Sequence, residues 1–259
     1  MKRVMSMIFI ESLMVALSTY SIIPMPHFEW NEKNMKYAIC FFPVVGVFCG
    51  VLIWLFASLG TILNASKFFV ALASTCIPLL ITGGIHMDGF MDTVDALSSH
   101  QTKERKLEIL SDPHIGAFAV IYCGIYLILN MAFLYEIYSL GQLFVLCPVY
   151  VLSRCASSLC AVNLPNARKS GMLSSYTKDA KRKTVNIVMI SVAVISITAM
   201  LLISPVVGAA SIVVGILWTV FYCNIAKKQF GGVTGDTTGF FLQMFELCSM
   251  MGIWIGAMI

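Results

Sequence analysis

Residues 67–95 read KFFVALASTCIPLLITGGIHMDGFMDTVD. An apolar run of nearly bilayer length leads directly into a glycine pair and three aspartates. Asp88, Asp92 and Asp95 follow one another at i, i+4 and i+7, so on a helix they occupy one face. Three like charges this close repel one another, and a helix that carries them needs protonation or a bound cation. The stretch therefore predicts a membrane boundary and a cation site in the same place.

The chemistry of these side chains favours Mg²⁺, with Mn²⁺ as the alternative, because carboxylate oxygens are hard ligands. No Lys or Arg lies within the triad to offset its charge. The simpler interpretation is a solvated helix start with Asp88 as its cap. A zinc site or a disulfide framework is not expected, since the nine cysteines contain no C-x-x-C and most lie inside apolar runs.

Composition sets the class of the protein. Of 259 residues, 59% are hydrophobic and 12% are charged, about half the charged share of a soluble domain. Several apolar runs reach the ~20 residues that cross a bilayer. We expect one domain, residues 1–259, folded as an all-α polytopic integral membrane helix bundle. The net charge of +4 is modest, and the basic residues lie in loops, so no nucleic-acid partner is expected.

The apolar runs predict about seven spans, at 35–63, 67–85, 115–138, 140–164, 185–203, 206–225 and about 238–258. The segment 4–25 is expected to be re-entrant or interfacial, because Lys2, Arg3 and the 27–34 loop then share one side. An N-terminus outside the cell is the alternative.

Successive loops of a polytopic protein lie on alternate sides of the membrane, and this alternation places the polar motifs on one side. The loops at about 86–114, 165–184 and 226–237 carry nearly all the Lys and Arg, so the positive-inside rule makes that side cytoplasmic. We expect these loops to form the active site of a multi-pass protein of the cell (inner or plasma) membrane. Residues 103–110 predict a short amphipathic helix whose charged residues face solvent.

A second polar turn precedes the last span. It reads Gly231-Gly232-Val233-Thr234-Gly235-Asp236, and exposed amides at such a helix start suit an anion such as phosphate. Asp236 would add a carboxylate to a metal. A turn with an ordinary N-cap is the simpler interpretation.

Charges inside or beside spans are the remaining candidates. Arg154 lies deep in an apolar run, where a charge is costly and usually paired, and Asp88, Asp236 or a phosphate are the expected partners. Glu246 is intramembrane and therefore a functional candidate by default. Arg168 either binds phosphate or only marks topology, and His86 either joins the site or only makes a hydrogen bond.

Taken in order, these motifs resemble the cobalamin synthase family (adenosylcobinamide-GDP ribazoletransferase, cobalamin 5′-phosphate synthase). The resemblance covers nearly the whole chain. It rests on Ile22-Ile23-Pro24-Met25-Pro26, Gly83-Gly84-x-His86-x-Asp88-Gly89-x-x-Asp92-Thr93-x-Asp95, Asp112-x-x-Ile115-Gly116-Ala117-Phe118, Arg154, Leu164-Pro165-x-Ala167-Arg168-x-x-Gly171, Gly231-Gly232-x-Thr234-Gly235-Asp236-x-x-Gly239 and Glu246. The chain departs from the family pattern at Ala96, Asn166 and Phe240, which leaves every candidate ligand in place.

The resemblance implies a Mg²⁺-dependent transferase that joins adenosylcobinamide-GDP to α-ribazole, or to its 5′-phosphate, and releases GMP. Asp88, Asp92, Asp95 and Asp236 would be metal ligands, and Asp95, with Asp92 as the alternative, would accept the hydroxyl proton. Arg154 would act with Asp92 and Asp95 in catalysis. The substrate-binding set would be Gly83, Gly84, His86, Arg168, Gly232, Thr234, Gly235 and Glu246.

Two other classes compete with this interpretation. A CDP-alcohol phosphotransferase also sets aspartates on membrane helices, but its D-x-x-D-G-x-x-A-R run is absent here. A cation-coupled transporter would carry acids at the bilayer midplane on several spans. Here they gather at one boundary. The sequence leaves a homo-oligomer open.

Overall fold

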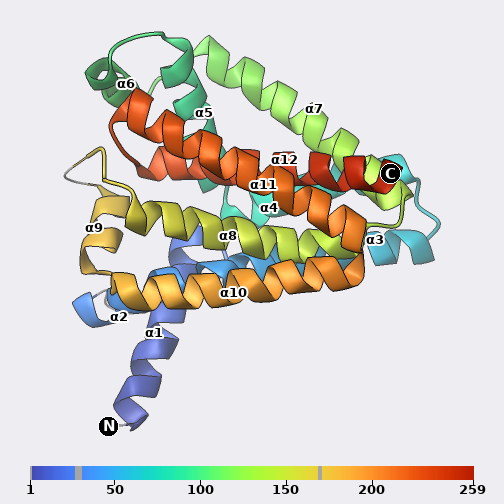
Figure 1. Ribbon diagram of the computed structural model, residues 1–259, viewed down its shortest axis with the longest axis horizontal. Coiled ribbons are helices and arrows are strands. Elements are labelled where there is room, and N and C mark those ends of the chain that lie inside the picture. Colours follow the sequence, from blue (N-terminus) through green and yellow to red (C-terminus); the bar gives the residue numbers. More distant parts are fainter. Residues whose placement is uncertain (1, 27–30, 169–170) are drawn as a thin grey trace.

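The computed structural model describes residues 2–26, 31–168 and 171–259, and within these ranges the regular elements are helices (Figure 1). Three short helical segments, η1 (Ile39–Phe41), η2 (Leu143–Val145) and the π-helical η3 (Ala226–Phe230), adjoin the longer ones. The longer helices are α1 (Lys2–Tyr20), α2 (Glu32–Ala38), α3 (Phe42–Ile62), α4 (Lys67–Thr82), α5 (Ile85–Ser98), α6 (Lys103–Ile109), α7 (Ala117–Ser139), α8 (Leu146–Asn163), α9 (Met172–Asp179), α10 (Arg182–Ile203), α11 (Pro205–Ile225) and α12 (Gly235–Met258).

The long helices confirm the expected polytopic membrane bundle. In the part of the chain described, six are long and apolar enough to cross a bilayer, and the bent pair α4–α5 raises the number to seven if it counts as one span. The six are Asn34–Ile62, Ala117–Ser139, Leu143–Asn163, Arg182–Ile203, Pro205–Phe230 and Gly235–Met258.

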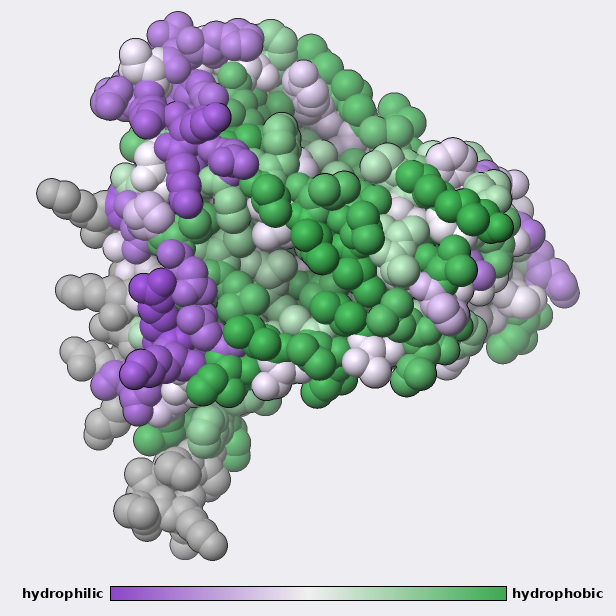
Figure 2. Space-filling model, in the orientation of Figure 1, coloured by the Kyte–Doolittle hydropathy of each residue, from purple (hydrophilic) through white to green (hydrophobic). Residues whose placement is uncertain are grey.

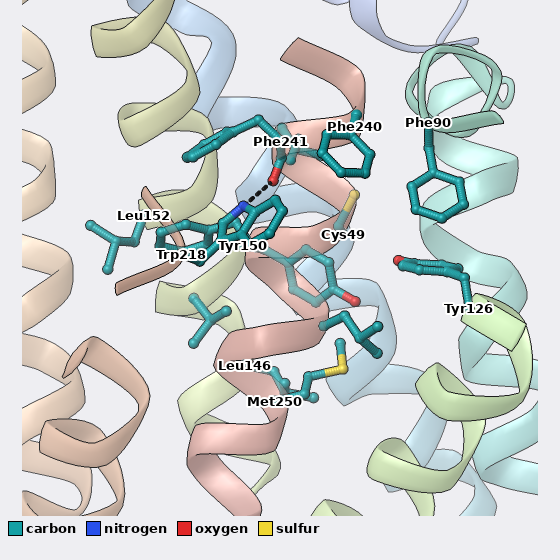
Figure 3. Packing of buried hydrophobic residues seen from close by; sticks show 14 of the residues in the cluster. Cys49, Phe90, Tyr126, Leu146, Tyr150, Leu152, Trp218, Phe240, Phe241 and Met250 are labelled. Atoms are coloured by element: carbon teal, nitrogen blue, oxygen red, sulfur yellow. Dashed lines mark hydrogen bonds between the residues drawn. The ribbon is translucent and has the colours of Figure 1, made fainter. Parts of the chain in front are cut away.

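Helices α8 and α12 form the centre of the bundle. In each, 67% of the most apolar window is buried, against 17% in α10, whose exposed Ile and Val side chains suit contact with lipid. Figure 3 shows buried side chains of this region, among them Tyr150 of α8 and Phe241 of α12, and the Trp218 indole of α11 donates a hydrogen bond of 3.0 Å to the Phe241 carbonyl. The buried Trp218 N–H is thus satisfied within the protein, as a membrane environment favours.

The chain turns sharply between α4 and α5. Gly83 (φ +60°) and Gly84 (φ +78°) both take the left-handed conformation that favours glycine, and the two helix axes differ by 96°. Figure 1 shows α5 lying across the end of the bundle that also carries α6 and α9. Helix α5 therefore lies outside the spanning segments, and the acidic stretch runs along the bundle's end.

Polar side chains gather at that end. Figure 2 shows hydrophilic residues concentrated there, beside a largely hydrophobic flank along the long helices. Helix α1 also runs across the bundle at this end (Figure 1), and its apolar part, Met7–Tyr20, is shorter than the six spans. Both features agree with an interfacial N-terminal segment.

The polar loops are shorter than the sequence suggested. Residues 86–114 hold α5 and the predicted short helix α6, residues 165–184 hold α9, and α11 continues through η3 to Phe230, which leaves 231–234 as the turn before α12. Charged residues in short amphipathic helices read as loop in a hydropathy pattern, which explains the difference.

Candidate active site

Helices α5 and α12 cross in direct contact, and this crossing builds the site. A Cβ at Gly89 would fall 2.8 Å from the Asp236 Cα, and a Cβ at Gly239 would fall 2.9 Å from the His86 carbonyl oxygen. Any larger residue at Gly89 would push the helices apart. The crossing sets Asp88 of α5 beside the first turn of α12, where Asp236 lies, and both side chains line one cavity.

Two loops pair at the same end of the bundle and position the guanidinium of Arg168. The backbone of Ala167 donates to the Val233 carbonyl (2.9 Å), and that of Val233 donates to the Pro165 carbonyl (2.8 Å), which forms a parallel bridge. This pairing holds Arg168 next to α12, with its Nη1 3.8 Å from Oδ2 of Asp236. Its Nη2 donates a 2.5 Å hydrogen bond to the Leu107 carbonyl at the end of α6.

The predicted glycine turn serves partly as a cap. Thr234 is the N-cap of α12, and its hydroxyl accepts a 3.1 Å hydrogen bond from the Thr237 amide. Gly232 is buried against the Pro165 backbone, whereas Gly235 is exposed in the first turn. The capping role of Thr234 agrees with the simpler interpretation of the sequence. Gly235 is the turn residue that lines the cavity shared with Asp88 and also a second, adjoining cavity.

Negative charge accumulates around Asp92. Burial, followed by the charges of Asp88, Asp236 and Asp95, raises the pKa of Asp92 to about 6, while the Arg168 guanidinium opposes the shift. Asp95 lies further along α5, where its carboxylate packs against Gly116, the N-cap of α7. A carboxylate at a helix N-terminus is stabilised by the helix dipole, so the start of α7 is a structural partner for Asp95. Asp88 and Asp236 lie in the first turns of their own helices, α5 and α12.

The donor set fits Mg²⁺. No three of the His, Cys, Asp and Glu side chains in the described ranges already form a metal-binding group. Mg²⁺ commonly binds through one or two carboxylates and completes its shell with water and substrate phosphate oxygens, without an all-protein cage. Asp88, Asp92 and Asp236 offer such carboxylates, and their mutual repulsion gives a divalent cation a favourable place.

Two adjoining cavities open beside these carboxylates. The larger, about 290 Å³, is lined by the carboxylate residues Asp88 and Asp236 and by the aromatic residues Tyr20 and Phe42. The smaller, about 120 Å³, is lined by Arg168 and also by Asp236. The site therefore combines the Arg168 guanidinium, carboxylates and aromatic side chains.

His86 belongs to the wall of the larger cavity. Its side chain is 6% exposed, and its ring centroid lies 6.2 Å from that of Tyr20 and 5.5 Å from that of Phe42. Burial, helped by the Arg154 charge, lowers the pKa of His86 to about 3, so the ring is neutral. Its Nε2 is buried without a hydrogen-bond partner.

Arg154 and Glu246 lie in the bundle interior and pair with each other. Their side chains are 1% and 2% exposed, and Nη1 of Arg154 donates to Oε1 of Glu246. Ser153 donates to the same oxygen (2.9 Å), and the Arg154 guanidinium also donates to the Tyr150 carbonyl (3.1 Å). The expected partners Asp88 and Asp236 were therefore wrong, and a phosphate partner stays a prediction. The sequence did not reveal that α8 and α12 bring two buried charges to the same depth.

The structure also shows that one residue expected to be solvated is buried, and it adds three residues to the site. Lys106, expected on the solvated face of its helix, is 5% exposed and donates a 2.5 Å hydrogen bond to the Gln229 side chain. Tyr20, Phe42 and Ser158 line the larger cavity, although each lies in or beside an apolar run and gave no signal. Gly83 and Gly84 form the α4–α5 turn described above.

Comparisons with known proteins agree over nearly the whole chain. A family model described as cobalamin-5-phosphate synthase matches residues 12–254. An adenosylcobinamide-GDP ribazoletransferase from Lachnoclostridium phytofermentans is 39% identical over 247 residues, covering 95% of this chain and 94% of the relative. Proteins of the same name from Clostridium botulinum (strain Alaska E43) and Alkaliphilus oremlandii are each 30% identical, covering 93% and 95% of this chain and 95% and 97% of their own lengths. No solved structure matches the chain.

Proposed function

Because the chain belongs to the cobalamin-5-phosphate synthase family, we propose that it joins adenosylcobinamide-GDP to α-ribazole, or to its 5′-phosphate, with release of GMP. The reaction is a Mg²⁺-assisted phosphoryl transfer at the polar end of the bundle. One observation carries the proposal: Asp88, Asp92 and Asp236 gather with Arg168 beside a cavity large enough for a small substrate.

The chemistry requires positioning and charge neutralisation more than covalent help. A ribose hydroxyl oxygen bonds to the cobinamide-side phosphorus, the bridging P–O bond breaks, and GMP leaves with its electron pair. Bound Mg²⁺ would neutralise charge on the pyrophosphate oxygens. Asp88 and Asp236 are the ligands best placed for it, since both line the cavity.

The side chains of this chain would do the rest. Arg168 faces Asp236 and the smaller cavity, where its guanidinium can donate charge-assisted hydrogen bonds to phosphate oxygens. Asp92 lies one turn along α5 from Asp88 and interacts with both cavity carboxylates. We assign the hydroxyl proton to Asp92. Asp95, the first choice from sequence, becomes the alternative because its carboxylate packs against α7.

The buried pair has a different role in this proposal. Arg154 and Glu246 line neither of the two cavities described, so they act by fixing α8 against α12. Arg154 is accordingly a positioning residue. Variants of Arg154 and Glu246 distinguish this role from the direct part in catalysis that was expected for Arg154.

The active site would face the cytoplasm across the cell membrane. Basic residues concentrate in the loops at the polar end, as the positive-inside rule requires of a cytoplasmic face. In a background without native cysteines, a cysteine introduced at Ser98 or at Lys181 should react only with reagent supplied from the cytoplasm. Labelling of either position from outside would overturn this orientation.

One reconstituted assay tests the function. The detergent-purified protein is given adenosylcobinamide-GDP, α-ribazole and Mg²⁺, and GMP and corrinoid products are followed. GMP and the joined corrinoid should form in equal amounts, and chelation of Mg²⁺ should stop both. Release of CMP from a CDP-alcohol, or cation-dependent uptake into vesicles without GMP release, would instead support one of the two competing classes.

A further inference from the structure

The larger cavity has two kinds of lining residues. Asp88, Asp236 and Thr238 are polar and belong to the place of the proposed reaction. Tyr20 and Phe42 form an aromatic wall, in which their ring centroids lie 4.3 Å apart and Tyr20 lies at 27° to the His86 ring. A flat ring entering this cavity would meet both aromatic side chains and carboxylates.

Two residues that line this cavity, His86 and Ser158, each carry a buried polar atom without a partner. Ser158 is 1% exposed, and neither its hydroxyl nor Nε2 of His86 makes a hydrogen bond within the protein. A buried polar atom without a partner is destabilising, and one that lines a cavity points to a ligand or to water that a ligand displaces. Ser74 is also buried and unpartnered, but the crevice that it lines has no room for a ligand.

The size and character of the cavity select among the parts of the two substrates. At about 290 Å³ it lies at the lower limit of small-molecule sites, so the corrinoid of adenosylcobinamide-GDP cannot enter. Guanine carries several donors and acceptors on its edges, and each would need a partner on a mostly apolar wall. A glycosylated benzimidazole is flat and apolar, and it retains one ring nitrogen that accepts a hydrogen bond.

We propose that this cavity binds the acceptor nucleoside, with its heteroaromatic base stacked on Tyr20 and its ring nitrogen hydrogen-bonded to Ser158. The sugar then lies toward Asp88 and Asp236, where its hydroxyl meets the phosphorus. This inference rests on the proposed function, and it assigns the aromatic wall to one of the two substrates. Ser158 and Tyr20 are binding residues for the base, and His86 supports the ring of Tyr20.

Steady-state kinetics of Ser158→Ala and Tyr20→Leu test the assignment, with each substrate varied in turn. Ser158→Ala should raise the KM for α-ribazole about two- to tenfold, as expected for one lost hydrogen bond. Tyr20→Leu should raise it at least about fivefold through lost stacking. The KM for adenosylcobinamide-GDP should stay unchanged in both. Ser74→Ala removes an equally buried and unpartnered hydroxyl far from the cavity, so it should change neither constant.

A size test sharpens the result. Ala161 is buried in the same wall, and Ala161→Leu should discriminate against α-ribazole in favour of the nucleoside of unsubstituted benzimidazole, which lacks its two methyl groups. Elution profile and Tm establish that each variant is folded. A raised KM for adenosylcobinamide-GDP with unchanged α-ribazole kinetics would assign the wall to guanosine and overturn the proposal. Equal, small effects of Ser158→Ala and Ser74→Ala would overturn it as well.

Direct binding separates this inference from the proposed function. Equilibrium dialysis of labelled α-ribazole against the purified wild-type protein needs no turnover. Binding that Tyr20→Leu weakens supports the cavity assignment even if no GMP is released, in which case the proposed reaction alone fails. Turnover by the wild-type protein, together with α-ribazole binding that is unchanged in Tyr20→Leu, would overturn the assignment and leave the reaction standing.

Discussion

The bundle interior and the bundle's polar end treat charge in opposite ways. In the interior, Arg154 and Glu246 neutralise each other and are nearly inaccessible to solvent. At the polar end, Asp88, Asp92 and Asp236 lie together and face Arg168, whose Nη1 is 3.8 Å from Asp236. A charge pair that is complete within the protein serves the fold. A surplus of one sign beside a cavity leaves charge for a ligand to complete.

The strongest test of this contrast adds or removes charge at the polar end. Asp88→Asn and Asp236→Asn should each lower turnover by at least about a hundredfold, since each removes a carboxylate that would hold the Mg²⁺ that neutralises charge on the transferring phosphoryl group. Raised Mg²⁺ should partly rescue both. Asp92→Asn should be equally inactive but resist rescue, because it would lose the proton acceptor.

The control is Glu108→Gln, which removes an exposed acid of α6 that pairs with Arg105 and should leave turnover unchanged. Near-normal activity in both Asp88→Asn and Asp236→Asn would mean that the cluster is only a solvated cap. Mg²⁺ rescue of Asp92→Asn together with a dead Asp95→Asn would return the proton to Asp95.

In the interior the expected damage is to stability. Arg154→Met leaves Glu246 buried without its partner, and breaking a buried pair costs about 3–5 kcal/mol. Replacing both residues, as Arg154→Met with Glu246→Met, should recover most of that loss. Unfolding in mixed micelles compares the wild-type protein with the single and the double variant. A double variant that is stable yet inactive would contradict the positioning role and restore Arg154 to direct catalysis.

Arg168 connects the two kinds of region, since it pairs with Asp236 and still lines a cavity. Arg168→Ala should cost about 1.5–3 kcal/mol of transition-state stabilisation, or roughly tenfold to 150-fold in kcat/KM, if it donates to phosphate. Lys181→Ala removes an exposed basic residue before α10 and should have little effect. Equal effects of the two substitutions would reduce Arg168 to a topology marker.

The sequence predicted what local pattern controls. Apolar run length predicted the six long spans, whereas the run 67–85 forms the 16-residue α4 and the start of its bend into α5. The i, i+4 spacing of Asp88 and Asp92 put both on one helix face, near the carboxylate of Asp236. The short helix α6 was expected from its amphipathic pattern. These features depend either on residues that are close together in the chain or on the side of the membrane on which a loop lies.

Contacts between spans that are distant in the chain could not be predicted from the sequence. The pairing of Arg154 with Glu246 depends on how deeply α8 and α12 slide past each other, and nothing in either run records that register. Tyr20, Phe42 and Ser158 looked like ordinary apolar-run residues until three helices brought them to one cavity. The burial of Lys106 likewise depends on η3, which continues a helix where a loop was expected.

The smallest expected effect is a pH dependence of stability confined to the polar end. The pKa of Asp92 is raised to about 6 in the folded protein, above its ordinary value of 3.8. Between these values the folded state binds more protons than the unfolded state, so stability falls as pH rises. Without Mg²⁺, the Tm of the wild-type protein should therefore be higher at pH 5 than at pH 7.5.

Asp92→Asn should remove this part of the pH dependence and raise the Tm at pH 7.5, where the wild-type carboxylate is ionised. A difference of a few degrees is expected, because 1 kcal/mol shifts Tm by about 2–4 °C in chains of similar size. Mg²⁺ added at pH 7.5 should stabilise the wild-type protein more than Asp92→Asn, since a cation relieves the same repulsion. Glu108→Gln is again the control, because its carboxylate is exposed and paired. If the wild-type protein and Asp92→Asn follow the same Tm profile with pH, the carboxylates do not repel one another as described. The polar end would then resemble the interior, with its charges already satisfied.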